Sequence, residues 1–211
     1  MDVSTAAETI IATGRRLGAR GLIAAGEGNL SVRLDDQRVL VTPTGRHKDE
    51  LTRADLVVVR LGHDAGTGLE TARSPSGLAP SSDLRIHLAI YGARPDVGAI
   101  AHAHLPALMA LTLAGEVPDP EVLPETALLL PRLPYLPFGE MGSAELAGRI
   151  AAVLAEPPEP FANAVLLERH GAVAVGADAG AAADRLELIE VLARTWRDAL
   201  LIRGSRAANQ R

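Results

Sequence analysis

The 211-residue chain contains no cysteine, so it can form no disulfide, and any metal site must use histidine and carboxylate side chains. Aromatic residues make up only 2% of the sequence, which argues against a surface that stacks the bases of single-stranded nucleic acid. The only lysine is Lys48, which we expect on a polar turn. That position argues against a mechanism that depends on a Schiff-base lysine.

Positive charge is also scarce, because the formal net charge is -5 and the isoelectric point is near 5.7. An acidic chain is a poor general partner for polyanions, so we expect no nucleic-acid partner. A small phosphate pocket is compatible with this charge, because backbone amides and a helix terminus can bind phosphate without a basic surface.

No apolar run is long and uninterrupted enough for a membrane span. The longest, residues 97–115, is interrupted by two histidines and a proline. The first residues lack the basic region followed by an apolar core that marks a signal peptide. We therefore expect a cytoplasmic protein with no membrane partner.

Hydrophobic residues make up 47% of the sequence, enough for one well-filled domain over residues 1–211. Hairpin-like strands mixed with helices predict an α/β protein with a mostly antiparallel sheet covered by helices. The first helix is expected to begin at a capping box formed by Thr5 and Glu8. The last helix is expected over residues 179–202, with residues 204–211 as a frayed tail.

Two histidines, His102 and His104, flank one small residue directly after a predicted strand over residues 96–100. Side chains two positions apart in a strand point to the same face, so both imidazoles could approach one ion. Imidazole is a favoured ligand of zinc and its first-row neighbours. The alternative is that one or both are hydrogen-bonded core residues, because this spacing arises easily by chance.

A third histidine, His170, precedes Gly171 in a sharp turn between two predicted apolar strands. A histidine in such a turn can project into a cleft, and the alternative is a purely structural hydrogen-bonding role. His63 lies in a stretch rich in Gly, Ser, Thr and Pro, residues 62–80, which is expected to form a long loop or an irregular hairpin.

Ser81, Ser82 and Asp83 crowd the start of a helix predicted over residues 83–94. The simplest explanation is N-terminal capping, with the acid favoured by the helix dipole. The alternative is an anion bound by free amides and hydroxyls, with Asp83 as a nearby base. His87 follows Asp83 by one turn and could pack in the core or support that acid.

Two turns offer further small polar groups and backbone N–H donors. One contains Gly28 and Asn29, and the other contains Thr42, Thr44 and Gly45. Each turn alone is weak evidence, since most such turns serve only to reverse the chain. Their occurrence in one chain with the serine pair and the histidines is much more informative.

The ordered segments are Gly-Asn-Leu-Ser-Val-Arg, Val-Thr-Pro-Thr-Gly, Ser-Ser-Asp with His-Leu-Ala-Ile-Tyr, His-Ala-His and a late His-Gly. This set resembles the class II aldolase and adducin head family over about residues 9–201. The motifs are specific for the family and much less so for a substrate. The resemblance implies a three-layer α/β/α sandwich around a mostly antiparallel sheet, assembled as a homotetramer with active sites at subunit boundaries.

The resemblance also implies roles for particular residues. A divalent ion, Zn²⁺ with Mn²⁺ or Co²⁺ as alternatives, would be bound by His102, His104 and His170, and Asp83 would transfer a proton. The phosphate of a sugar substrate would bind at the residues that match or flank the family's phosphate site: Gly28, Asn29, Thr42, Thr44, Gly45, Ser81 and Ser82. The implied reaction is the reversible cleavage of a ketose 1-phosphate to dihydroxyacetone phosphate and a short aldehyde.

Two residues depart from the aldolase pattern. Asp83 stands where the aldolases that act on fuculose 1-phosphate carry Glu, so the carboxylate reaches about 1.5 Å less far. Related pentulose-phosphate 4-epimerases carry Asp there, so 4-epimerisation, or decarboxylation of a sugar-acid phosphate, is an alternative on the same metal site. Glu27 occupies a position that is often small and polar, and it would repel phosphate if it faced that group.

A third alternative is a non-enzymatic interaction protein similar to adducin heads. Such a protein would be expected to have lost its metal ligands, whereas all three histidines are retained in this chain.

Overall fold

The structure is a computed structural model that describes residues 1–61 and 72–209. Within these residues the strands form one sheet in the order β3-β2-β1-β4-β7-β6-β5. Neighbouring strands are antiparallel except β5 and β6, which are parallel. The strands are β1 (Asn29–Asp35), β2 (Arg38–Val41), β3 (Val57–Arg60), β4 (Ala99–Ala103), β5 (Tyr135–Leu136), β6 (Ala164–Leu167) and β7 (Gly171–Gly176). The expected mostly antiparallel sheet is confirmed.

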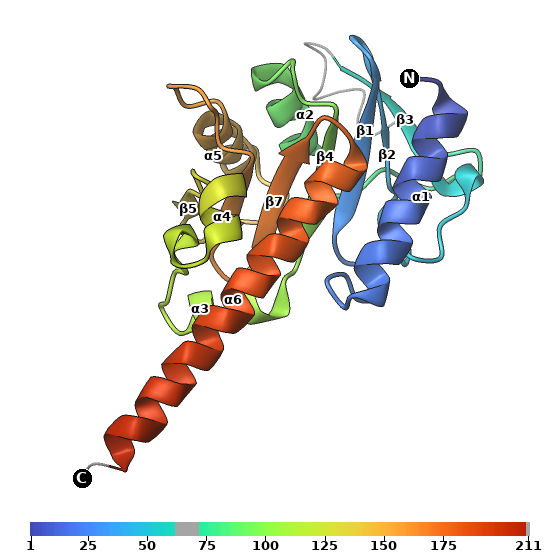
Figure 1. The fold of residues 1–211 in the computed structure, drawn as a ribbon. Coiled ribbons are helices and arrows are strands. Elements are labelled where there is room, and N and C mark those ends of the chain that lie inside the picture. The colour runs from blue at the N-terminus through green and yellow to red at the C-terminus, as the bar shows by residue number, and fades with distance from the viewer. Residues whose placement is uncertain (62–71, 210–211) are drawn as a thin grey trace.

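Helices cover both faces of this sheet, with α1, α3 and α6 on one face and α2 and α5 on the other (Figure 1). The α-helices are α1 (Val3–Ala19), α2 (Leu84–Ala93), α3 (Pro106–Leu113), α4 (Pro124–Leu129), α5 (Ala144–Leu154) and α6 (Ala179–Ala208). Two short 3₁₀ helices are η1 (Arg53–Asp55) and η2 (Pro120–Val122). The three-layer α/β/α arrangement expected from the sequence is confirmed.

The central strands show why the sheet packs between these layers. On β4, Ala99, Ala101 and Ala103 belong to the core on the α6 side, whereas Ile100 belongs to the core on the α2 and α5 side. Strand β7 follows the same rule, with alanines toward α6 and valines toward α2 and α5. The small side chains let α6 approach the sheet closely, so a core with few aromatic residues still fills its space.

The strand that carries the histidine pair differs from its prediction. It runs over Ala99–Ala103 instead of residues 96–100, so His102 lies within β4 and His104 follows its end. Asp96 belongs to the turn after α2, where it forms an ion pair of 2.7 Å with Arg94. The apolar run alone could not locate this boundary, because Val97 is buried like the strand residues although its backbone N–H closes the turn on the carbonyl of Arg94.

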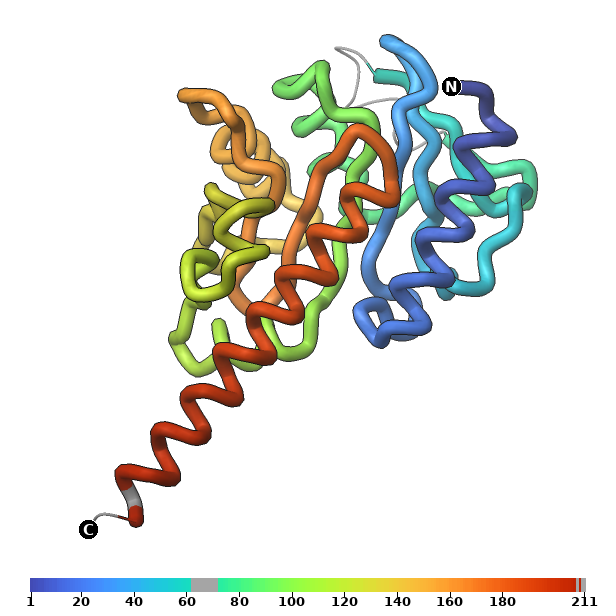
Figure 2. The backbone as a smooth tube through the Cα atoms, in the orientation of Figure 1, coloured from blue at the N-terminus to red at the C-terminus, as the bar shows by residue number. Residues whose placement is uncertain are grey.

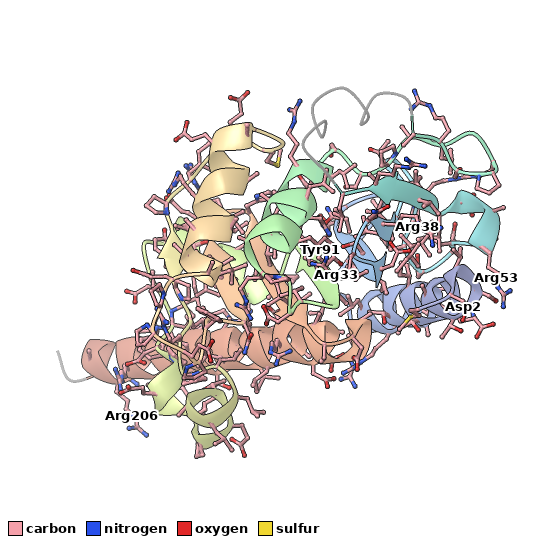
Figure 3. All side chains as sticks on the ribbon, turned by 90° about the horizontal axis from the view of Figure 1, so that it is seen from above. Asp2, Arg33, Arg38, Arg53, Tyr91 and Arg206 are labelled. Atoms are coloured by element: carbon pink, nitrogen blue, oxygen red, sulfur yellow. The ribbon has the colours of Figure 1, made fainter. Side chains whose placement is uncertain are left out.

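The predicted capping box at the start of α1 is wrong. Asp2 is the N-cap, and its carboxylate accepts hydrogen bonds from the backbone N–H (3.0 Å) and the hydroxyl (2.6 Å) of Thr5. Glu8 forms an ion pair with Arg53 instead. Figure 3 shows Asp2 and Arg53 at the same end of the molecule.

Helix α6 is longer than the sequence predicts, because it continues from residue 202 to Ala208 through most of the expected tail. Gly204 does not end it, since one glycine without a following proline only weakens a helix. The C-terminal end of α6 projects away from the rest of the chain (Figure 2). No described helix combines the length and apolarity needed to cross a membrane.

The predicted loop over residues 62–80 is described only in part. Residues 62–71, including His63, lie outside the described residues. Residues 72–80 contain no helix or extended strand, and Pro80 forms an isolated antiparallel bridge with Pro43. This bridge brings the chain before Ser81 next to the turn that follows β2.

Gly171 supplies a test of how β7 packs beside β4. Its φ is +101°, and a Cβ placed there would lie 2.1 Å from the carbonyl oxygen of Ala103. We expect Gly171→Ala to lower the free energy of unfolding by at least about 2 kcal/mol, because both the backbone conformation and the contact oppose a side chain. Denaturant-induced unfolding measures the effect.

Gly204→Ala is the matched control for this substitution. A Cβ at Gly204 meets open space within α6, where alanine is favoured over glycine. Its stability should therefore equal or slightly exceed that of the unchanged protein. Equal stabilities for the two variants would contradict the close approach of β7 and β4.

Candidate active site

Three histidines from two separate segments meet at one end of the sheet. His102 lies on β4, opposite Asn29 of β1 and Val173 of β7. His104 follows β4, and His170 lies in the turn between β6 and β7. The centroid of the His102 ring lies 5.0 Å from that of His104 and 4.7 Å from that of His170, and the His104 and His170 centroids are 5.0 Å apart. The structure therefore brings the predicted metal ligands together.

The nitrogen atoms of these rings fit a metal site. One ligand atom from each histidine lies within 4.8 Å of the others. Nδ1 of His102 lies 3.0 Å from the carbonyl oxygen of Ala172, so Nδ1 carries the hydrogen and Nε2 has a free lone pair. Nε2 of His102 and Nδ1 of His170 are buried without a hydrogen-bond partner among the described residues. Three convergent imidazoles, two of which have an orphaned nitrogen, form a donor set that suits Zn²⁺, Co²⁺ or Mn²⁺.

The electrostatics of the cluster favour neutral rings. Burial lowers the pKa of His102 well below its usual value, and the neighbouring His170 and His104 lower it further. Burial and His104 also lower the pKa of His170. A neutral imidazole is the form that can ligate a metal, so the surroundings prepare these side chains for that role.

The carboxylate of Glu27 is directed at this cluster. Its Oε2 lies 2.9 Å from Nδ1 of His104, and its Oε1 accepts a hydrogen bond of 2.9 Å from the backbone N–H of Ala24. This contact holds hydrogen on Nδ1 of His104 and leaves Nε2 free. The sequence suggested only that Glu27 could repel a phosphate, because its contact with His104 joins segments far apart in the chain.

Asp83 occupies the N-cap position of α2 but makes no side-chain capping hydrogen bond. Its Oδ2 accepts a hydrogen bond of 2.9 Å from Nδ2 of Asn29 and lies 3.9 Å from Nε2 of His102. Capping of α2 therefore does not explain this acid. Instead, its carboxylate lies beside the imidazole cluster, within reach of a ligand bound there.

A buried chain of hydrogen bonds orients Asn29 and, through it, Asp83. Nε2 of His87 lies 2.5 Å from Oδ1 of Asn29, and Nδ1 of His87 lies 2.6 Å from the hydroxyl of Ser31. The hydroxyls of Ser31 and Tyr91 are 2.9 Å apart. Burial lowers the pKa of His87 to about 3, so the ring stays neutral. A neutral ring that donates from Nε2 requires the Asn29 carbonyl to face His87 and its amide to face Asp83.

The outer end of this chain of hydrogen bonds is covered by a cation. The guanidinium carbon of Arg33 lies 4.6 Å from the ring centroid of Tyr91. The two side chains are adjacent in Figure 3. His87 was expected to pack in the core or to support Asp83, and the structure connects it to Asp83 through Asn29.

A cavity of about 330 Å³ opens in front of the histidines and the acid. The sequence-predicted site residues that line it are Gly28, Asn29, Thr44, Ser81, Ser82, Asp83, His104 and His170. Hydroxyl groups, an amide, imidazoles and a carboxylate are therefore available to one bound molecule.

Three predicted residues do not line this cavity. His102 lies behind it and is 1% exposed. Thr42 is fully buried, and its hydroxyl accepts a hydrogen bond of 3.1 Å from the backbone N–H of Leu30, which ties the turn to β1. Gly45 has a φ of +68° and shapes the turn that carries Thr44.

Position 28 requires glycine, because the backbone of β4 lies close to it. Its φ is +66°, and a Cβ there would lie 2.9 Å from the carbonyl oxygen of His102. A side chain would therefore push the Asn29 segment away from β4.

Lys48 corrects one prediction from the sequence. It does lie on a turn, but its side chain is 1% exposed and forms part of the cavity wall. The polar neighbours of Lys48 in the sequence are exposed, so local composition gave no sign that this side chain points inward.

Comparison with known proteins defines the class of this chain. The family model described as Class II Aldolase and Adducin N-terminal domain matches residues 8–197. The chain therefore belongs to the class II aldolase and adducin family, as the ordered motifs predicted.

The similar proteins carry the names of different activities. The chain is 32% identical to methylthioribulose-1-phosphate dehydratase of Acidiphilium cryptum, covering 90% of this chain and 89% of that protein. It is 34% identical to 3-oxo-tetronate 4-phosphate decarboxylase of Haemophilus influenzae, covering 90% and 85%. The L-fuculose-1-phosphate aldolase structure from Thermus thermophilus superposes with a TM-score of 0.78 at 27% identity, covering 95% and 97%. Family membership thus leaves the particular reaction open.

The metal site predicts the outcome of removing one ligand. We expect the metal-stripped chain to rebind about one Zn²⁺, and His104→Ala to weaken that affinity by more than about 100-fold, because two imidazoles remain. A competition titration against a zinc chelator measures both values. His47→Ala, which removes an exposed histidine elsewhere in the chain, is the control. Unchanged zinc affinity in His104→Ala would refute the site.

The contact between Glu27 and His104 predicts a smaller effect. Glu27→Gln keeps an acceptor for Nδ1 of His104 but removes the negative charge that makes the imidazole a better ligand. We expect zinc affinity to fall by about 10-fold. Glu8→Gln, on the exposed face of α1, should leave affinity unchanged. Equal affinities for the two variants would show that the carboxylate does not tune His104.

Proposed function

We propose that this protein is a metal-dependent lyase that cleaves a carbon–carbon bond of a phosphorylated sugar. The substrate we propose is a ketose 1-phosphate similar to L-fuculose 1-phosphate, cleaved reversibly to dihydroxyacetone phosphate and a short aldehyde. The observation that carries the proposal is the convergence of three imidazoles with Asp83 at a cavity lined by small hydroxyl residues.

In this proposal, the phosphate binds to hydroxyl and backbone groups at one side of the cavity. Ser81, Ser82 and Thr44 line that side, and none of them carries a formal charge that would repel a dianion. A phosphate held there contributes binding energy away from the reacting bond and orients the sugar chain toward the imidazoles.

Asp83 is proposed as the group that moves the proton. Its carboxylate is fixed by the amide of Asn29, which is itself fixed by His87. A base held in this way needs little reorganisation when it accepts a proton from a substrate hydroxyl. A divalent ion bound by His102, His104 and His170 would supply Lewis-acid polarisation of the substrate carbonyl.

Decarboxylation of a sugar-acid phosphate is a second candidate. The specific observation in its favour is the 34% identity to 3-oxo-tetronate 4-phosphate decarboxylase over 90% of this chain. Loss of carbon dioxide and aldol cleavage both leave an electron pair next to a carbonyl, so the same donor set serves either reaction. A further alternative is 4-epimerisation, because the acid at position 83 is Asp, as in the related 4-epimerases.

A non-enzymatic role similar to that of adducin heads is less well supported. The three histidines, the acid and the cavity are all present together, and an interaction domain needs none of them.

The remaining proposals concern the ion, the assembly and the location. Zn²⁺ is proposed as the native ion, with Mn²⁺ or Co²⁺ as alternatives, and carbohydrate metabolism in the cytoplasm as the setting. A homotetramer is proposed, without nucleic-acid or membrane partners. Exposed apolar side chains on α6, including Val191, Leu201 and Ile202, support self-association.

An assay of products tests the reaction. We expect the zinc-loaded chain to release dihydroxyacetone phosphate from L-fuculose 1-phosphate, or carbon dioxide from 3-oxo-tetronate 4-phosphate. We expect Asp83→Asn to lower kcat by at least about 100-fold, because the proton acceptor is lost.

The same assay includes methylthioribulose 1-phosphate, the substrate in another relative's name. Turnover of that compound alone, an isomeric product alone, or no turnover of the three compounds would overturn the proposed carbon–carbon cleavage.

A further inference from the structure

The only lysine of the chain lies in the wall of the candidate active site. Lys48 follows the turn after β2, and its side chain is 1% exposed. Together with Glu27, Thr44 and Ser81 it lines the cavity of about 330 Å³. The proposed reaction assigns no role to this buried amine.

Lys48 connects two loops that are far apart in the sequence. Its Nζ donates a hydrogen bond of 2.7 Å to the carbonyl oxygen of Gly26, before β1. It donates a second, of 2.6 Å, to the carbonyl oxygen of Arg46, after β2. The same loops pack closely, since a Cβ placed on Gly26 would lie 3.5 Å from the backbone of Gly45. Gly26 lies three residues before Asn29, which fixes Asp83, and Arg46 lies two residues after Thr44, which is proposed to bind phosphate.

The second notable feature of Lys48 is its charge relative to the other residues that line the cavity. Among the described residues that line it, Glu27 and Asp83 are carboxylates, whereas Lys48 is the only lysine or arginine. No described carboxylate lies within 4.0 Å of its Nζ. A buried cation without an ion-pair partner is costly, and an anionic ligand would compensate it.

The donor geometry agrees with an anionic ligand. An ammonium group has three N–H donors, and the carbonyls of Gly26 and Arg46 account for two of them. Burial lowers the pKa of Lys48 to about 8, and the nearby Glu27 acts in the opposite direction. A phosphate dianion in the cavity would also favour the charged amine.

We propose that Lys48 is a positioning residue for the phosphate group: it ties the Gly26 and Arg46 loops together and supplies the cationic charge that a bound phosphate faces. This inference rests on the proposed function, because it assumes a phosphorylated substrate. It explains how an acidic cavity with two carboxylates accepts a dianion. It also assigns Lys48 a role that requires no Schiff base.

A single labelled side chain makes the proposal directly testable. The full zinc-loaded chain, prepared with ¹³C at Cε of lysine, gives one lysine signal, because Lys48 is the only lysine. Titration with inorganic phosphate is expected to shift this signal saturably. A saturable enthalpy of phosphate binding without any shift of the lysine signal would overturn the role of Lys48.

Substitution tests the same point independently. We expect Lys48→Met to weaken phosphate binding by about 10- to 100-fold and Lys48→Arg to recover part of the loss, since it restores the charge without the same reach. Arg60→Met is the charge-matched control. Arg60 is exposed and lies at the end of the β2–β3 pairing remote from Thr42, so phosphate affinity should stay unchanged.

These experiments distinguish failure of the proposed phosphate site from failure of the role assigned to Lys48. Absence of phosphate binding by the unchanged protein would overturn the proposed phosphate site itself. Phosphate binding with equal affinity in the unchanged protein and folded Lys48→Met would overturn only the inference about Lys48. If Lys48→Met does not fold, the role of Lys48 is tested with the labelled unchanged protein and with Lys48→Arg. A lysine signal that does not shift when phosphate binds would then contradict the inference.

Discussion

The register of β4 between β1 and β7 is the constraint on which the site depends. Antiparallel pairing sets His102 opposite Asn29 on one side and Val173 on the other. The turn before β7 then brings His170 beside the end of β4. A slip of one residue would turn His102 to the α6 face, where alanines pack against the helix. The register that buries both faces of the sheet is therefore the same register that brings the imidazoles together.

The buried polar side chains beside β4 are hydrogen-bonded to one another in a chain that leads to Asp83. Tyr91, Ser31, His87 and Asn29 form a chain of hydrogen bonds that ends on the carboxylate of Asp83. The exceptions are informative, because two of the four buried side-chain nitrogens without partners among the described residues belong to the histidine cluster. Native interiors seldom leave such atoms unpaired, and a bound ion would satisfy them.

Much of this arrangement could be predicted from the sequence, and the limits have physical causes. Strand alternation and turn chemistry indicated the sheet, and the ordered motifs identified His102, His170 and Asp83. Local pattern cannot show which distant segments meet, so Glu27 was not connected to His104, and Lys48 was expected on a polar turn although its side chain points inward. Both contacts join loops whose approach is set by the sheet and not by neighbouring residues.

The most direct measurement of the central claim is anomalous diffraction at the zinc absorption edge from crystals soaked in Zn²⁺. The account predicts one strong peak about 2.0–2.1 Å from a nitrogen of each of the three imidazoles, next to the Asp83 carboxylate. Diffraction that shows no ion among these rings, with zinc absent or bound at another surface, would contradict it.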